Sequence, residues 1–320
     1  MPDDAMPPAK RPIRVLLAAP RGYCAGVERA IQIVEAALAS RDDPIYVRHE
    51  IVHNRHVVEE LEAKGAVFVD EIDEVPDGAL VIFSAHGVAR KVVGETENRR
   101  LEYLDATCPL VNKVHAEAAA RVRQGLHVLL IGHAGHPEVE GTLGQVPAGA
   151  ISLVESVADA ESVTVPDPAH VAYTTQTTLS VDDTTEIIAA LTRRFPAIAA
   201  PGKADICYAT TNRQDAVKAI APRADAVLVI GAPNSSNSLR LVEVSERLGT
   251  DAYLIQRASD IDPQWLEGVG TLGLTAGASA PELLVREVVE KLGQWRTVEE
   301  TTIMAAEEKM VFKLPRQLLD

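Results

Sequence analysis

Short β-branched runs alternate with amphipathic helical stretches along almost the whole chain from residue 13 onward. The predicted strands are residues 13–19, 127–131, 171–173, 226–230, 253–255 and 271–274. The predicted helices are residues 27–39, 110–123, 181–195, 213–221, 239–248 and 281–292. Because strands that alternate with helices form parallel sheets covered by those helices, the sequence predicts an α/β fold.

Three cysteines, Cys24, Cys108 and Cys207, each stand shortly before a predicted helix. The stretch from one cysteine to the next is about as long as a small domain. We therefore expect three related α/β domains with one cysteine each, at residues 13–107, 108–205 and 206–296. Residues 297–320 are expected to form a C-terminal tail that packs on the body, and residues 310–314 could add an edge strand.

Composition and charge exclude several classes of protein. The formal net charge is −15, whereas nonspecific nucleic-acid binding requires a basic face. Apolar residues make up 47% of the chain, which is typical of folded proteins. The apolar runs are too short for a spanning helix or a signal peptide, so we expect no membrane segment. An odd number of widely spaced cysteines is typical of a reducing compartment, and we expect a cytoplasmic protein.

The contexts of the cysteines allow two interpretations. Free cysteine is often simply a buried packing residue. However, Gly22 and Gly26 flank Cys24 and permit close backbone approach, and each cysteine is predicted at a strand end or helix start, where the helix dipole favours a thiolate. Three thiolates that meet would form a metal or cluster site with one coordination position left for a substrate. No closely spaced cysteine pair announces such a site.

Polar side chains recur at similar places. His53, His86 and His136 each follow a strand-like run. Residues 234–238, which include Ser235, Ser236 and Asn237, open a predicted helix, and such helix starts bind anions. Ser279 precedes another helix, although Ser279 with Glu282 also matches a capping box.

An acid and a hydroxyl-rich run complete the candidate site. Glu138 follows His136 by two residues, and Thr177 and Thr178 belong to a threonine-rich segment after the strand at residues 171–173. A carboxylic acid beside a hydroxyl can relay a proton to a leaving oxygen when its pKa lies near the working pH. Threonine is also a common strand residue, which accounts for the run without any catalytic role.

Taken together, these motifs resemble the 4-hydroxy-3-methylbut-2-enyl diphosphate reductase family, which catalyses the last step of the non-mevalonate route to isoprenoids. The matching segments are residues 22–27, 84–88, 106–109, 135–139, 176–180, 207–214 and 234–238. The match runs in order along nearly the whole chain. Tyr23 stands where phenylalanine is expected and Glu28 where aspartate is common, and both changes are mild.

The resemblance implies three α/β domains with small, mostly parallel sheets, arranged with pseudo-threefold symmetry around a [4Fe–4S] cluster. It implies that Cys24, Cys108 and Cys207 hold the cluster, that Glu138 delivers a proton, and that Thr177 relays it or orients the substrate hydroxyl. The implied ligands of the substrate diphosphate are His53, His86, His136, Ser235, Ser236, Asn237 and Ser279, with Thr178 as a further pocket residue. Two electrons and two protons would then expel water from the allylic diphosphate and yield isopentenyl or dimethylallyl diphosphate.

The chain has no further cysteines for a second cluster and no dinucleotide-binding glycine motif. Electrons would therefore come from a separate protein of the ferredoxin or flavodoxin type. Two other readings stay open at this point. One is a zinc-dependent hydrolase with Glu138 as base, and the other is a non-enzymatic iron–sulfur sensor or electron carrier.

Overall fold

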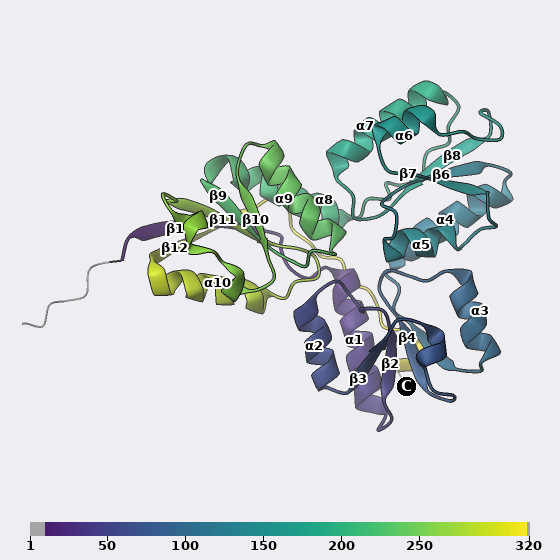
Figure 1. Cartoon of the computed structure of the whole chain (residues 1–320), viewed down its shortest axis with the longest axis horizontal. Coiled ribbons are helices and arrows are strands. Elements are labelled where there is room, and N and C mark those ends of the chain that lie inside the picture. The colour runs from purple at the N-terminus through teal and green to yellow at the C-terminus, as the bar shows by residue number, and fades with distance from the viewer. Residues whose placement is uncertain (1–9, 319–320) are drawn as a thin grey trace, which may run out of the picture. The chain divides into compact units, whose positions relative to one another are not determined.

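The computed structural model describes residues 10–318, and the chain divides into two compact units (Figure 1). Unit 1 contains the N-terminal segment up to Gly22 together with residues 212–308, and unit 2 contains residues 23–211 and the segment after Glu308. The described residues form three separate sheets, and every registered strand pair is parallel. The predicted α/β class with small parallel sheets is therefore confirmed.

Unit 1 is built on a five-stranded sheet with the order β10-β9-β11-β1-β12. Its strands are β1 (Pro12–Ala19), β9 (Ala226–Ile230), β10 (Ala252–Ile255), β11 (Thr271–Ala276) and β12 (Thr297–Met304). Its helices are α9 (Ser236–Arg247), α10 (Glu282–Trp295) and the part of α8 (Tyr208–Ile220) from Asn212 onward. Val15 packs in the core formed with α10, whereas Leu16 packs with α8. Since helices cover both faces, β1 and β9 consist almost entirely of buried apolar residues.

The first sheet of unit 2 has the order β3-β2-β4-β5. Its strands are β2 (Ile45–Arg48), β3 (Ala66–Val69), β4 (Leu80–Phe83) and β5 (Glu102–Asp105), and its helices are α1 (Ala25–Ser40), α2 (Arg55–Ala63) and α3 (Arg90–Asn98). Ile82 of β4 packs in the cluster that contains α1 and α2, and its neighbour Phe83 packs in the cluster that contains α3. The alternation of side chains along the strand therefore gives each face its own core.

The second sheet of unit 2 has the order β7-β6-β8. Its strands are β6 (His127–Ile131), β7 (Ile151–Val154) and β8 (Val171–Thr175), and the helices around it are α4 (Pro109–Arg123), α5 (Pro137–Leu143), α6 (Val157–Ser162) and α7 (Val181–Arg194). Leu129, Ile131 and Val171 pack with residues of α6 and α7 in one core. Because the strands are parallel, their carboxyl ends share one edge, and α5 and the Thr177 segment both start from it.

The strands of the sheets do not follow the expected domain boundaries. β1 lies inside the expected segment 13–107, yet it pairs with β11 on one side and with β12 on the other. Residues 297–304, expected to be tail, form the edge strand β12, whose eight residues all pair with β1. The prediction of a strand at residues 310–314 was wrong, since that stretch is irregular. The stretch after β12 instead packs by side chains, with Leu314 and Leu318 against the core of α1 and α2.

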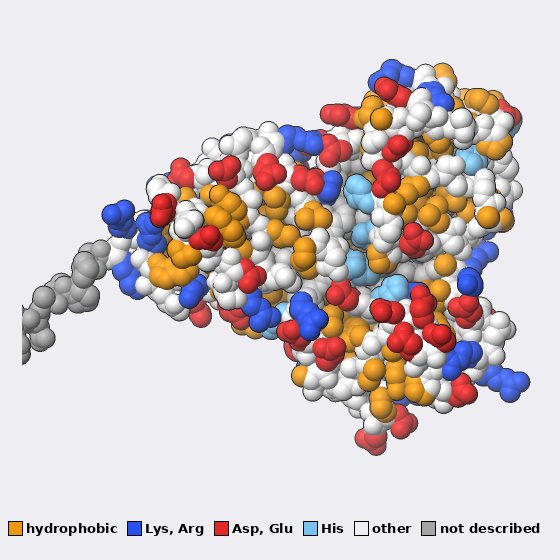
Figure 2. Space-filling model, viewed as in Figure 1, with side chains coloured by type: hydrophobic (Ala, Val, Ile, Leu, Met, Phe, Trp, Pro, Cys, Tyr) orange, Lys and Arg blue, Asp and Glu red, His pale blue; other side chains and the backbone are white. Residues whose placement is uncertain are grey.

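Two surface properties bear on function. No helix within residues 10–318 combines the length and the apolar character needed to cross a membrane. On the face visible in Figure 2, Lys and Arg side chains are interspersed with Asp and Glu, and no large basic surface appears there.

Candidate functional site

All three cysteines lie in unit 2, and each precedes a helix. Cys24 is the N-cap of α1, and Cys108 is the N-cap of α4, with Pro109 in the first turn. Cys207 directly precedes α8, and its Sγ accepts the Thr210 backbone N–H at 3.4 Å. The first turn of a helix presents unpaired N–H groups and a positive dipole end, so each thiol stands where a thiolate is favoured.

The three thiols are also close to one another. A side-chain carbon added at Gly26 would lie 2.6 Å from Cys108 Sγ and 3.8 Å from Cys24 Sγ. Burial raises the pKa of Cys108 to about 12, and the neighbouring thiolates of Cys24 and Cys207 add to the rise. Burial and Cys24 raise the pKa of Cys207 to about 11, opposed by hydrogen bonds from Thr210. A positively charged group bound beside Cys108 and Cys207 would oppose this effect and stabilise both as thiolates.

The donor set fits an iron–sulfur cluster. Within residues 10–318, no three His, Cys, Asp or Glu side chains converge on one point as a single metal ion requires. A cluster is held by thiolates that bind different irons, so its cysteines surround a volume. Gly26 lies against two of the sulfurs and brings no side chain between them.

Glu138 is a buried acid next to the cysteine segments. It lies in the first turn of α5 and is 2% exposed. Its Oε1 accepts the Thr177 backbone N–H at 2.7 Å, and its Oε2 accepts the Thr177 hydroxyl at 3.0 Å. Burial raises the pKa of Glu138 to about 7, although the Thr177 hydrogen bonds act in the opposite direction. The Thr177 carbonyl in turn accepts the Cys207 backbone N–H at 3.0 Å, which links the acid to a cysteine.

The three predicted histidines form one cluster in unit 2. The His53 and His86 rings stack with centroids 4.0 Å apart, and the His136 ring lies edge-on to both, at 5.6 and 6.0 Å. Glu50 Oε2 lies 3.1 Å from Nδ1 of His53. Burial and the neighbouring rings lower the pKa of His86 well below its usual range. Burial, with His53 and His133, lowers the pKa of His136 to about 3. The two buried rings are therefore neutral at pH 7.

Thr178 lies beside this group, where its hydroxyl accepts a hydrogen bond from Gln176 Nε2 at 2.9 Å. Gln176 also accepts the His133 backbone N–H at 3.2 Å. The threonine-rich segment is thereby bonded to the loop that leads to His136.

Sequence reasoning missed the residues that fix the Cys207 segment. Asp205 accepts the Thr174 hydroxyl at 2.7 Å and the Thr175 N–H at 3.0 Å, and it pairs with Lys113 Nζ at 2.9 Å. Its side chain is fully buried. The lysine lies on α4, far away in sequence, so no local pattern could have revealed the pair.

The remaining predicted residues gather in unit 1. Ser235 is the N-cap of α9, and Ser236, Asn237 and Ser279 are all buried. The amide atoms of Asn237 have no hydrogen-bond partner among the described residues. A side-chain carbon at Gly277 would lie 3.4 Å from Asn237 Nδ2, so the loop before Ser279 borders the start of α9. This cluster of hydroxyl and amide groups is built mainly from uncharged donors.

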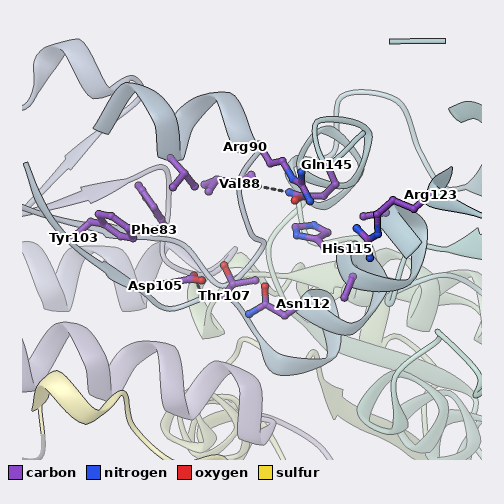
Figure 3. A pocket seen from close by; sticks show the side chains of 13 residues that line it. Phe83, Val88, Arg90, Tyr103, Asp105, Thr107, Asn112, His115, Arg123 and Gln145 are labelled. Atoms are coloured by element: carbon purple, nitrogen blue, oxygen red, sulfur yellow. Dashed lines mark hydrogen bonds between the residues drawn. The ribbon is translucent and has the colours of Figure 1, made fainter. Parts of the chain in front are cut away.

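Unit 2 contains a further cavity of about 460 Å³, shown in Figure 3, which none of the predicted site residues lines. His115 of α4 borders it, and burial lowers the pKa of His115 to about 4. Gln145 donates to the Val88 carbonyl at 2.8 Å and to the Gly141 carbonyl at 2.9 Å. These bonds join the loop of His86 to α5, which carries Glu138.

Comparison with known proteins adds independent evidence. Residues 15–293 match the LytB protein family. A Phenylobacterium zucineum protein named 4-hydroxy-3-methylbut-2-enyl diphosphate reductase is 60% identical over 311 residues, which cover 97% of this chain and 99% of that protein. The protein of that name from Edwardsiella ictaluri is 59% identical over 309 residues, which cover 96% and 98%.

Solved structures agree. The E-1-hydroxy-2-methyl-but-2-enyl-4-diphosphate reductase from Plasmodium falciparum superposes with a TM-score of 0.90 at 37% identity, and the match covers 98% of each chain. A structure described as (E)-4-hydroxy-3-methyl-but-2-enyl diphosphate reductase, the terminal enzyme of the non-mevalonate pathway, gives a TM-score of 0.62 at 31% identity, covering 88% of this chain and 99% of that one. The resemblance predicted from the motifs is therefore confirmed, and this chain belongs to the LytB family.

Proposed function

We propose that the chain reduces 4-hydroxy-3-methylbut-2-enyl diphosphate to isopentenyl and dimethylallyl diphosphate and releases the hydroxyl as water. The observation that carries this proposal is the buried acid Glu138, whose pKa is raised to about 7, hydrogen-bonded to Thr177 in the same unit as three grouped thiols. The names of the relatives support the same reaction. The balance is two electrons and two protons taken up for each water lost.

Cys24, Cys108 and Cys207 would hold a [4Fe–4S] cluster, which when bound supplies electrons and a Lewis-acid iron for the substrate hydroxyl. The electrons would arrive from a separate protein of the ferredoxin or flavodoxin type. Thiolate ligands need a reducing compartment, which supports a cytoplasmic location.

Glu138 would hold the proton that the leaving hydroxyl needs. With a pKa of about 7, the carboxyl group is substantially protonated at neutral pH and can release its proton without a large energetic cost. The Thr177 hydroxyl lies 3.0 Å from Oε2, which is close enough to pass the proton on or to orient the substrate oxygen. The burial that raises the pKa also keeps bulk water from competing for the proton.

The diphosphate would be bound by ring N–H, hydroxyl and amide groups. His53, His86 and His136 would supply ring N–H groups, and Ser235, Ser236, Asn237 and Ser279 would supply hydroxyl and amide groups, with Thr178 as a further contact. A bound anion would favour the charged form of a histidine and raise the low pKa of His136. Substrate binding is therefore expected to be accompanied by proton uptake.

The deciding experiment measures iron, zinc and acid-labile sulfide per chain in anaerobically purified protein, together with its visible spectrum. We expect iron and sulfide near four each, with a broad brown absorption that changes when the diphosphate substrate is added in stoichiometric amount. Colourless protein with tightly bound zinc would overturn the proposal in favour of a hydrolase. A cluster whose visible spectrum does not change when the diphosphate is added would overturn the proposal in favour of a sensor or electron carrier.

A further inference from the structure

Helix α8 contacts the Cys24 loop on both sides of the cysteine. Tyr208, its first residue, contacts Ala25, which follows Cys24, and Arg213, farther along, contacts Gly22, which precedes it by two residues. Cys207 directly precedes the same helix. One rigid element thus contacts the flanks of one cysteine and is continuous with another.

The contact with Tyr208 replaces a missing helix cap. The N–H groups in the first turn of α1 have no partners within the helix, and the side chain of its N-cap, Cys24, makes no capping hydrogen bond. The Tyr208 hydroxyl accepts the Ala25 N–H at 3.2 Å. Tyr208 therefore supplies from another helix what a serine or aspartate N-cap would supply, and Cys24 Sγ is left uncommitted.

The contact with Arg213 fixes the other flank. Arg213 is fully buried, and its Nε and Nη2 donate to the Gly22 carbonyl at 3.1 and 2.7 Å. Gly22 has φ +68°, a conformation that L side chains rarely adopt. In this conformation the Gly22 carbonyl oxygen is placed where the Arg213 guanidinium donates to it.

The buried charge of Arg213 is paired with Glu308. Nη1 lies 2.9 Å from Glu308 Oε1, which also accepts Asn212 Nδ2 at 3.0 Å. Gly22, Asn212 and Glu308 are the residues of unit 1 at which the chain leaves or enters it. One arginine therefore ties together all three places where the described chain crosses between units.

We infer that Tyr208 and Arg213 are positioning residues for Cys24, and that they hold it at a set place relative to Cys207 through α8, with Glu308 as the counter-ion of Arg213. That Tyr208 and Arg213 hold Cys24 in place as a ligand of a cluster rests on the proposed function. The placement of the thiol itself can be tested without any cluster. The proposed role of Tyr208 and Arg213 involves no contact with the substrate.

The test compares Tyr208→Phe and Glu308→Gln with the control Tyr46→Phe, which changes a tyrosine packed in the core beside α3. Cluster-free protein is treated with iodoacetamide under anaerobic reducing conditions, and alkylation of each cysteine is followed by mass spectrometry. We expect the rate at Cys24 relative to Cys108 to rise about tenfold in Tyr208→Phe, the factor that corresponds to one lost hydrogen bond, and to rise in Glu308→Gln, which removes the charge that pairs with Arg213. In protein that contains the cluster, release of iron to a chelator should also be faster in the two test variants than in wild type.

Wild-type ratios in both Tyr208→Phe and Glu308→Gln would overturn the inference, as would an equal rise in Tyr46→Phe. If Glu308→Gln fails to fold, Tyr208→Phe still decides, because it removes one oxygen and preserves the ring. If the wild-type protein takes up no iron and sulfide, the proposed cluster fails while the alkylation ratio still reports on the placement of Cys24.

Discussion

Replacing Gly26 by alanine should separate protein stability from cluster binding. Gly26 is the second residue of α1, in ordinary helical conformation, where alanine is favoured over glycine by up to about 1 kcal/mol. The added methyl carbon would lie 2.6 Å from Cys108 Sγ, about 1 Å short of an ordinary contact of about 3.5–4.0 Å. Overpacking of this kind costs about 1–3 kcal/mol. The free energy of unfolding of cluster-free protein should therefore fall by no more than about 3 kcal/mol.

Cluster binding should suffer far more, because the methyl occupies the space next to two of the three thiols and displaces Cys108 Sγ. We expect Gly26→Ala protein, after reconstitution, to hold less than half of the wild-type iron and sulfide. Gly94→Ala is the matched control, since Gly94 lies in α3 with nothing within 4 Å of the added carbon. It should gain up to about 1 kcal/mol and load normally.

Urea unfolding of the cluster-free proteins measures the first quantity, and iron and sulfide analysis measures the second. A Gly26→Ala protein that loads a full cluster and turns over normally would refute the placement of the thiols around Gly26. A protein that fails to load and is also destabilised by far more than about 3 kcal/mol would indicate general unfolding, and the reasoning from local contact would be wrong.

Three further predictions concern buried titratable groups. Glu138→Gln should fold, load its cluster and bind the diphosphate, yet lose about 10²- to 10⁴-fold in turnover; near-normal turnover would exclude the carboxyl group as the acid. Asp205→Asn should lower the pKa of Glu138, because the Asp205 charge helps raise it, so the loss of activity with rising pH should begin at lower pH; an unshifted profile would contradict this coupling. Because burial lowers the pKa of His115 to about 4, folding stability should be fully present above about pH 6.5 and decline toward pH 4, by about 3 kcal/mol from this group. His115→Phe should remove that part of the pH dependence in urea titrations, and an identical slope in wild type and variant would disprove it.

The elements that could be predicted from sequence are those whose burial leaves a local pattern. β9 was predicted at its observed bounds because a strand covered by helices on both faces reads as a continuous apolar run. The positions of His86 and Glu138 were also predictable in kind, since each follows a strand, β4 for His86 and β6 for Glu138.

What could not be predicted depends on contacts distant in sequence. The pairing of β1 with β11 and β12 leaves no trace in the composition of β1, which suits any buried parallel strand. β12 was missed because as an edge strand it is largely exposed and polar. Arg213 lies on a helix where an arginine ordinarily faces solvent, and only the approach of Gly22 and Glu308 makes it a buried residue.

The position of β1 between β11 and β12 has a consequence during synthesis. β1 is translated before the other described elements, and its neighbour β11 follows roughly 250 residues later, which takes about 12–50 seconds at typical elongation rates. Throughout that interval a strand whose side chains end up almost wholly buried has neither of its hydrogen-bonding neighbours. Residues 23–211, which are contiguous, can meanwhile complete both of their sheets. The nascent chain therefore carries an unpaired apolar strand ahead of a folded body, a state in which a chaperone that covers β1 would protect the chain from aggregation.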